Sequence, residues 1–545
     1  MKRPLVLHPF LLAAFPVLSL YARNANELRP DALLIPLIAV LGFVVVTYFP
    51  LSTWVLPGTK AGIVVSVFLV LWFSYGHVVE GLDRLFRARN IFDWGDLEVP
   101  LFVYLVWSLL FVKTLFWIRK PEKEFHKLTR FMNVLGCCLF CVPRIQIALF
   151  GLRSRPTLRE DAFRAPTTNL QSQQMSPSKP DIYYFILDGY ARADVLRRIF
   201  DYDNQPFLDD LTRRGFFVAA ASRSNYSQTT LSLASSFNLD YLQNLPVKFD
   251  SESDSRSPLQ ELILSNRLLA ILRERGYGTI SFPSGYPLTD LITADSFLSE
   301  GYGVDEFQSV LIGTTPVPQI LQGLDIGPLH GLRFFDPYES HRRRLLFPFE
   351  RIPELAKRPG PKFIFIHTLA PHPPFVFDAN GEPTTPKRPF SFATGDMFLQ
   401  LKGASESEYI EGYRRQLEFI NRVLVRTLDQ ILAVSPHPPV IILQADHGSD
   451  THLKYESLEG TDLSERLSIF NAYYFPGGKD VLYEGITPVN TFRVALNRYF
   501  GTNFDLLPDR SYFSTWSYPY KFIDVTSRTV PTVVETASTS SQVRK

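Results

Sequence analysis

Five apolar segments within the first 152 residues constrain the fold of this chain more than any other feature of its sequence. They lie near residues 4–21, 32–50, 61–79, 99–118 and 131–151. Each is close to the ~20 residues that a helix needs to cross a bilayer. Lys2 and Arg3 precede the first segment, but no small-residue cleavage site follows it, so we interpret it as an anchor rather than a cleaved signal peptide. The sequence therefore predicts a bundle of about five transmembrane helices over residues 1–152.

The basic residues of the loops predict the orientation of this bundle. Loop 119–130 is the richest in Lys and Arg, and short basic loops lie preferentially in the cytoplasm. With an odd number of spans, the N-terminus is then inside and everything after residue 152 is outside. The arginines within 84–89 would also lie outside, against the same rule. Pro143 and Arg144 interrupt the last segment, which could instead lie in the membrane interface.

Three further parts follow the apolar region. Residues 153–179 are polar, rich in Pro, Gln and Ser and without periodicity, which is typical of a linker. From about residue 180 to 525, strand-like and helix-like segments alternate, which favours an α/β domain with a parallel sheet between helices. Residues 526–545 predict a flexible tail. Within the domain, we expect one helix over 259–275 and a long amphipathic helix over 405–433.

Charge and cysteine content exclude some partners and some kinds of site. The formal net charge of +2 gives no electrostatic reason to expect a nucleic-acid partner. The three cysteines are Cys137, Cys138 and Cys141, all within the last apolar segment. The soluble region can therefore hold neither a disulfide framework nor a cysteine-ligated zinc ion. A metal bound there must be held by oxygen and nitrogen ligands.

Three apolar runs in the soluble region end in residues that can bind a metal. The runs are Ile182–Leu187, Phe363–Ile366 and Val440–Leu443, and the residues that end them are Asp188, His367 and the pair Asp446–His447. In open α/β sheets, ligands bind outside the carboxyl ends of the strands. One aspartate at a strand end is more often a turn residue than a ligand. Several together form an oxygen-rich set that suits Mn²⁺ or Zn²⁺.

A segment rich in hydroxyl groups, residues 224–238, opens a helix between the first two runs. Such residues usually only cap a helix. The functional interpretation is a nucleophile that a metal ion and the positive end of the helix activate. Adjacent helical residues do not face the same way, so Thr229 and Thr230 cannot both serve, and a hydroxyl at Ser232 would favour bonding to backbone. The residues alone leave Ser227 and Thr229 as contenders.

Taken together, these segments resemble the alkaline phosphatase/sulfatase superfamily. The resemblance is strongest to its membrane-bound lipid A phosphoethanolamine transferases and lipoteichoic acid synthases, in which about five spans precede an extracytoplasmic sulfatase-like domain. The resemblance covers about residues 180–480. It rests on four segments in the same order: Leu187–Arg192, Gln228–Phe237, Ile366–Pro374 and Asp446–Gly448. It implies a sulfatase-like fold for the soluble domain.

The resemblance also assigns roles to individual residues. It implies one divalent ion, Mn²⁺ or Zn²⁺, with the ligands Asp188, Thr229, Asp446 and His447. It places the nucleophile at Thr229, and it implies that His372 lies near the transferred group and takes part in catalysis. Further candidates, for contacts with the substrate, are His367, Asn225 and Arg192.

The chain also departs from the pattern of the family. The first acidic ligand is Glu in the phosphoethanolamine transferases and Asp188 here. The Cys/Ser-x-Pro-x-Arg sequence of sulfatases is absent around Thr229, which argues against sulfate ester hydrolysis. The later zinc-binding His of the transferases has only His452 as a counterpart nearby, and the second-metal residues of the nucleotide pyrophosphatases are not found. We therefore expect one metal ion rather than two.

These features predict a membrane-anchored, metal-dependent transferase. It would move a phospho-headgroup from a membrane lipid to an envelope lipid or glycan acceptor, through a covalent intermediate on Thr229. We expect a multi-pass protein of the bacterial inner or cell membrane, with its catalytic domain outside the cytoplasm. One alternative is a phosphodiesterase or phosphatase of the same fold, with water as the acceptor. Another is a non-catalytic envelope binding protein, against which the intact set of site residues argues.

Overall fold

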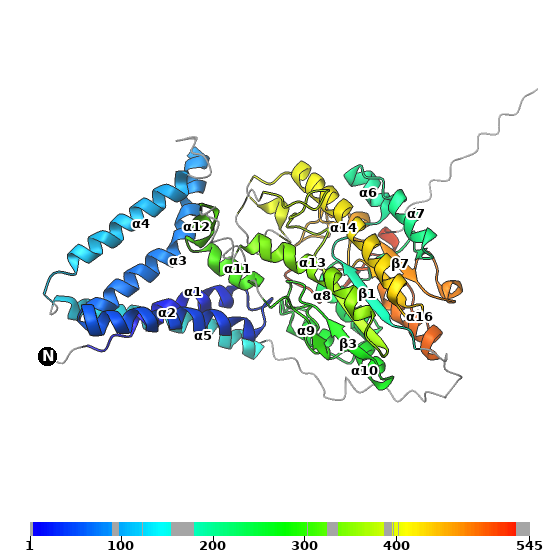
Figure 1. The fold of residues 1–545 in the computed structure, drawn as a ribbon, viewed down its shortest axis with the longest axis horizontal. Coiled ribbons are helices and arrows are strands. Elements are labelled where there is room, and N and C mark those ends of the chain that lie inside the picture. Colours follow the sequence, from blue (N-terminus) through cyan, green and yellow to red (C-terminus); the bar gives the residue numbers. More distant parts are fainter. Residues whose placement is uncertain are drawn as a thin grey trace, which may run out of the picture.

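The protein divides into an N-terminal group of helices and an α/β domain (Figure 1). The computed structural model describes residues 4–89, 98–121, 124–153, 179–301, 304–323, 336–385, 388, 395, 397–401 and 403–529. The predicted linker over 153–179 and the predicted tail over 526–545 fall mostly outside the described residues.

Five α-helices form the N-terminal part. They are α1 (His8–Arg23), α2 (Leu34–Pro50), α3 (Gly58–Arg89), α4 (Glu98–Trp117) and α5 (Phe125–Arg153). Four helical segments among the described residues are long and apolar enough to cross a membrane: Pro30–Val55, Gly58–Asp83, Val99–Trp117 and Phe125–Leu152. The chain is therefore a multi-pass membrane protein. A fifth span stays a prediction, because α1 has only 16 residues.

The last apolar segment, which Pro143 and Arg144 interrupt in the sequence, forms a continuous helix in the structure. Pro143 lies inside α5, which runs on to Arg153 without a break. The shorter α1 packs against α5, α3 and α2. About half of its residues are buried, so it is the most enclosed helix of the group rather than the most exposed to lipid.

The α/β domain is built on a seven-stranded sheet with the order β2-β7-β6-β1-β5-β3-β4. The strands are β1 (Ile182–Leu187), β2 (Phe217–Val218), β3 (Gly278–Ser281), β4 (Ser296–Phe297), β5 (Lys362–Thr368), β6 (Val440–Gln444) and β7 (Asn471–Tyr474). Strands β6, β1, β5, β3 and β4 are parallel, whereas β7 is antiparallel to both β6 and β2. The predicted α/β class is confirmed, with a mixed edge added to the parallel centre. A separate two-stranded sheet pairs β8 (Tyr512–Phe513) with β9 (Ile523–Asp524).

Helices cover both faces of this sheet. One layer holds α6 (Ala193–Phe200), α7 (Gln205–Arg213), α13 (Pro337–Ala356) and α14 (Glu406–Val434). The other holds α8 (Thr229–Asn238), α9 (Ser257–Leu264), α10 (Arg267–Glu274) and α16 (Pro488–Phe500). Every residue of β1, β5 and β6 is buried, because side chains that alternate between the two faces meet helices on both.

The structure tests both helices that the sequence predicts within this domain. The long amphipathic helix is confirmed as α14, which begins after the cap Ser405. The prediction of a single helix over 259–275 is wrong, because the structure divides this segment into α9 and α10. Asn266 causes the break: its side chain accepts a hydrogen bond from the Leu269 N–H at 2.8 Å and so starts a new helix.

The domain also contacts the N-terminal helices. Helix α11 (Glu306–Gly313) packs on α1, where the rings of Phe307 and Tyr21 meet edge to face with centroids 6.3 Å apart. Just beyond α11, the Thr314 carbonyl accepts a hydrogen bond of 2.9 Å from the Gly76 N–H of α3. Helices α12 (Val317–Gly323) and α15 (Leu463–Leu467) complete the described helices.

Candidate metal centre and active site

The register of the sheet brings three strand ends to one edge. Ile186 of β1 lies opposite His367 of β5 on one side and Gln444 of β6 on the other. Asp188 directly follows β1, and Asp446 follows β6 by one intervening residue. The carboxyl ends of these parallel strands therefore deliver their side chains to the same place.

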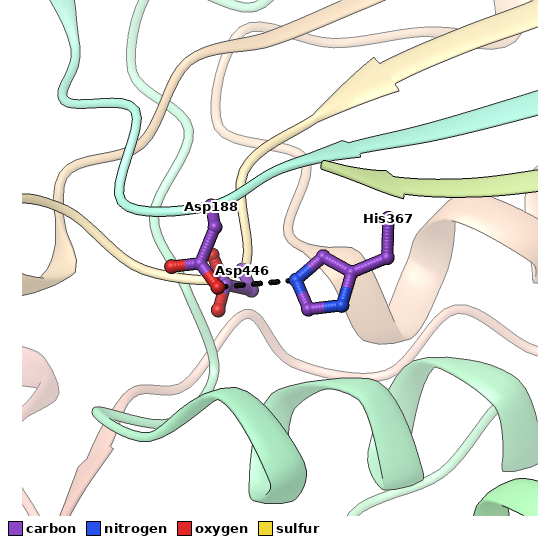
Figure 2. A group of neighbouring side chains, drawn as sticks. All are labelled: Asp188, His367 and Asp446. Carbon is purple, nitrogen blue, oxygen red and sulfur yellow. Dashed lines mark hydrogen bonds and ion pairs between the residues drawn. The ribbon is translucent and has the colours of Figure 1, made fainter. Parts of the chain in front are cut away.

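Asp188, His367 and Asp446 form the floor of the site (Figure 2). His367 Nε2 lies 3.1 Å from Asp188 Oδ2, and its Nδ1 lies 2.8 Å from Thr289 Oγ1, which fixes the plane of the ring. The Gly189 N–H donates to Asp446 Oδ1 at 3.1 Å. One ligand atom from each of the three residues lies within 4.8 Å of the other two.

Thr229 and His447 stand beside this floor. Thr229 is the first residue of α8, and its Oγ1 lies 3.0 Å from His447 Nε2. His447 Nδ1 lies 2.9 Å from the Gly448 carbonyl, which can only accept, so Nδ1 carries the proton and Nε2 presents its lone pair. That lone pair also faces Asp446 Oδ2 at 3.2 Å and Asp188 Oδ1 at 3.7 Å.

These atoms fit a divalent cation. Asp188 Oδ1 and Asp446 Oδ2 are buried and have no hydrogen-bond partner among the described residues. Buried carboxylate oxygens without a partner are costly, and a nitrogen lone pair pointed at them adds repulsion. Donors that share one tetrahedral Zn²⁺ lie about 3.3–3.6 Å apart, close to the separations seen here. The donor set of Asp188, Asp446, His447 and Thr229 therefore suits the ion that the sequence predicts.

The groups around the floor affect one another's protonation. Burial by itself would raise the pKa of Asp188, but the nearby charge of His372 and the hydrogen bond from His367 hold that pKa below its usual range. Burial lowers the pKa of His447, and the nearby guanidinium of Arg466 lowers it further. Hydrogen bonds and opposite charges therefore keep the Asp188 carboxylate ionised despite its burial.

A buried ion pair that sequence reasoning missed supports the site from one side. The guanidinium of Arg466 pairs with the Asp450 carboxylate, and its Nε donates to the Ser227 carbonyl at 2.7 Å. The Tyr455 hydroxyl donates to the same carboxylate at 2.9 Å. His372 Nε2 lies 3.6 Å from Asp450 Oδ2, while its Nδ1–H is held by the Pro373 carbonyl at 2.7 Å. No spacing in the sequence marks Arg466, because the pair forms only when the helix α15 (Leu463–Leu467), which contains Arg466, packs beside the loop that contains Asp450.

One pocket opens onto these groups. Its lining includes Asp188, Thr229, Thr230, His372, His447 and Arg466. The remaining walls come from Gln228, Gly285, Tyr286, His341, Arg344, Leu369, Pro373, Pro374, Gly395, Tyr455 and Trp516. The pocket therefore joins the proposed nucleophile, the Asp188 carboxylate and the guanidinium groups of Arg344 and Arg466 in one space.

The competing hydroxyl groups occupy different positions. Ser227 is buried, and its Oγ accepts a hydrogen bond of 3.5 Å from the Ser514 N–H. Ser232 is buried inside α8, with its Oγ 3.4 Å from Ser224 Oγ. Thr230 also lines the pocket, but it is Thr229 whose hydroxyl lies at hydrogen-bonding distance from the His447 ring. Geometry among the described residues therefore favours Thr229.

Two other predicted residues, Asn225 and Arg192, form bonds that stabilise the framework. Asn225 donates to Thr487 Oγ1 at 3.0 Å and accepts from the Val489 N–H at 2.8 Å. Arg192 forms a two-point pair with Asp194. Because these bonds already give both side chains a structural role, their contact with a substrate stays a prediction. His367 contacts Asp188 at the carboxylate floor.

A second group of possible ligands is His452, Asp462 and Glu465. His452 Nδ1 lies 2.8 Å from Glu465 Oε2, and Glu465 Oε1 accepts from Ser449 Oγ at 2.6 Å and from the Thr451 N–H at 2.8 Å. These bonds within the protein explain why His452 and Glu465 lie together. It therefore gives no support for a second metal ion.

Comparison with solved structures finds several of low sequence identity. The C-terminal periplasmic domain of EptC from Escherichia coli, in complex with zinc, is 12% identical with a TM-score of 0.40, and the match covers 65% of this chain and 94% of that one. The integral membrane lipooligosaccharide phosphoethanolamine transferase A of Neisseria meningitidis is 13% identical with a TM-score of 0.38, and the match covers 90% of this chain and 95% of that one. The phosphonate monoester hydrolase of Agrobacterium radiobacter is 14% identical with a TM-score of 0.40, and the match covers 61% of this chain and 80% of that one.

Sequence comparison gives the family. No curated protein sequence matches this chain. The sulfatase family model matches residues 180–494, which is more than half of the chain and includes Asp188, Thr229, His367, His372, Asp446 and His447. The chain therefore belongs to the sulfatase family, whose enzymes act on esters of sulfuric and phosphoric acid.

Proposed function

We propose that this enzyme transfers a phospho-headgroup from a membrane lipid to an envelope lipid or glycan, through a covalent intermediate on Thr229. The observation that carries the proposal is the position of Thr229 Oγ1, which lies 3.0 Å from His447 Nε2 beside the carboxylate floor. A nucleophile next to several metal-binding groups is an arrangement suited to ester chemistry.

Asp188, Asp446, His447 and the Thr229 oxygen would hold one Zn²⁺ or Mn²⁺. When bound, such an ion acts as a Lewis acid that lowers the pKa of the hydroxyl and neutralises charge on the phosphoryl oxygens. His367 lies 3.1 Å from Asp188 and orients that ligand, a role that residues around metal ligands often have. Thr229 is the first residue of α8, and the N-terminal end of a helix suits an anionic phosphoryl group.

The proposed transfer has two displacements. Thr229 Oγ1 attacks the phosphorus atom, the bond from phosphorus to the donor lipid oxygen breaks, and a phosphodiester remains on Thr229. The acceptor hydroxyl then attacks, and the bond from phosphorus to Thr229 Oγ1 breaks. His372, whose Nε2 faces Asp450 at the pocket, would carry the proton from Thr229 to the departing lipid oxygen and from the acceptor back to Thr229.

The membrane helices support a lipid as the donor. A soluble domain attached to several spans and packed against them lies next to lipid headgroups, so a lipid substrate need not leave the bilayer. The proposal requires the domain to lie outside the cytoplasm. A reporter fused at residue 160 should therefore be extracytoplasmic and one at residue 125 cytoplasmic. Activity of a cytoplasm-only reporter at 160 would overturn this part.

The central experiment follows the headgroup. The full chain in proteoliposomes would be supplied with phospholipid labelled in its phosphate, together with an envelope lipid or glycan fraction. Label that moves into the acceptor supports transfer. Label that appears only as water-soluble phosphate ester indicates the hydrolase alternative, in which water enters the same site. No release of label from any donor lipid would contradict both.

A further inference from the structure

Gln228 occupies the N-cap position of α8, directly before Thr229, but its side chain does not cap the helix. The N–H groups of a first helical turn have no acceptor within the helix, and Ser, Thr, Asp or Asn at the N-cap usually supplies one. Among the described residues, no backbone carbonyl accepts a hydrogen bond from the Thr229 or Thr230 N–H. Because Gln228, Thr229 and Thr230 all line the pocket, the uncapped start of α8 lies at the pocket.

The Gln228 amide is instead held by hydrogen bonds at both of its ends. Its Nε2 donates to the Ser514 carbonyl at 3.2 Å and to the Thr515 carbonyl at 3.0 Å. Its Oε1 accepts from Arg256 Nη2 at 3.1 Å. Gln228 is only 5% exposed, so these bonds are shielded from water. An amide that is bonded elsewhere at both ends is not free to accept from the first turn of α8.

Arg256 fixes the oxygen end of this amide. Its side chain is completely buried, and its guanidinium carbon lies 4.0 Å from the centre of the Trp516 ring. Nη2 also donates to the Trp516 carbonyl at 3.0 Å, and Nη1 donates to the Asp254 carbonyl at 3.0 Å. Because the ring and the two carbonyls leave the guanidinium little freedom, the Gln228 oxygen is held in one place.

We propose that Gln228 is a positioning residue whose amide, held by Arg256, keeps the start of α8 uncapped for the anionic group of the substrate. The anion is the phosphoryl group, whose negative oxygens suit the N-terminal end of a helix. A shorter capping side chain would compete with that group for the same N–H donors. The inference rests on the proposed function, because it states what prepares α8 for the group that Thr229 attacks.

Gln228→Ser and Gln228→Ala form a matched pair of variants. Both remove the amide and its bond to Arg256, but only Ser can cap α8, so the Ser variant should have the higher Tm of the two. It should nevertheless bind inorganic phosphate about fivefold more weakly than the Ala variant, because a cap of typical strength must first be displaced. Protection of the Zn²⁺-saturated full chain against thermal unfolding in detergent measures this binding.

Turnover gives a second readout. With the labelled lipid, kcat should be lower in Gln228→Ser than in Gln228→Ala, so that the more stable variant is the slower one. A side chain that only supported the fold would give the opposite order. Ser405→Ala is the control for capping itself, because exposed Ser405 caps α14 by accepting from the Glu408 N–H at 3.2 Å. It should lower the Tm and leave phosphate binding unchanged.

The outcomes separate the inference from the proposed function. Phosphate binding by Gln228→Ser that equals or exceeds that of Gln228→Ala would overturn the inference whatever the turnover is, and so would a wild type that phosphate does not protect. A wild type that binds phosphate but releases label to neither an acceptor nor water would overturn the proposed function alone, because phosphate binding reports the start of α8 independently.

Discussion

Thr229 and His447 are separated by 218 positions in the sequence, yet Thr229 Oγ1 lies 3.0 Å from His447 Nε2. The first starts a helix on one face of the sheet, and the second follows a central strand. Because the proton on His447 Nδ1 is held by the Gly448 carbonyl, Nε2 is left to face the hydroxyl. This relationship selects one hydroxyl among several in the same segment.

Replacement of this hydroxyl should separate chemistry from folding. Thr229→Ala should abolish turnover and any covalent phospho-enzyme, with little effect on thermal stability, because the side chain lies at the pocket rather than in the core. Ser227→Ala is the matched control and should keep measurable activity. Mass spectrometry of trapped enzyme checks the site of the adduct. An adduct on Ser227 would contradict the assignment and leave the class of reaction intact.

The metal content of the protein should depend on Asp188 and Asp446. The purified protein should hold about one Zn²⁺ or Mn²⁺ per chain, and Asp446→Ala should lose it. Removal of the ion by a chelator should lower the Tm, since an ion at 100 times its Kd stabilises the folded state by about 2.7 kcal/mol. Asp462→Ala, in the second acidic group, should keep the ion. Full retention by an Asp188→Ala, Asp446→Ala double variant, measured by elemental analysis, would refute the site.

The pair of Arg466 and Asp450 should matter for stability as well as for the pocket. Both side chains are almost fully buried, so Arg466→Met leaves a carboxylate without its partner and should cost about 3–5 kcal/mol of the free energy of unfolding. The Tm of the full chain in detergent measures the loss. Arg198→Met is the control, because Arg198 is half exposed in its pair with Asp462 at 2.6 Å and should change the Tm little. Equal shifts in the two variants would contradict this prediction.

His452 should give a small pH-dependent contribution to stability. Its bond to Glu465 raises the pKa of His452 above its ordinary value, and the charges of Glu465, Glu406 and Asp462 act the same way. A pKa raised on folding means that the stabilisation is fully present below about pH 6.5 and is lost as the pH rises through the folded-state pKa. The side chain is 44% exposed, so the effect should stay within ~1 kcal/mol.

The measurement compares His452→Ala with the wild type over a range of pH. The variant should have the lower Tm at about pH 5.5, and the two curves should converge at about pH 9. A difference in Tm that grows toward high pH would show that the sign is wrong.

The central strands and the site edge could be predicted from the sequence because their signals are local. Strands buried on both faces appear as unbroken apolar runs, and the polar residue that ends each run marks the edge of the sheet. The break between α9 and α10 was missed, because leucine periodicity continues across Asn266 and only the cap geometry ends the first helix. The antiparallel β7 was missed because hydrophobicity does not encode strand direction.

Contacts made by side chains far apart in sequence could not be predicted. Asp450 lies in a loop and Arg466 in α15, and nothing in the residues between them marks the pair. The roles predicted for Asn225 and Arg192 rest on their position near recognisable segments, whereas their bonds to Val489 and Asp194 depend on the folded structure.

The packing of α11 on α1 has a practical consequence for production of the protein. Phe307 and Leu311 are buried in one cluster with Val17 and Tyr21 of α1. A fragment that starts after residue 179 would expose these side chains to water and leave an adhesive apolar surface on an otherwise soluble domain. We expect such a fragment to self-associate unless Phe307 and Leu311 are replaced by polar residues.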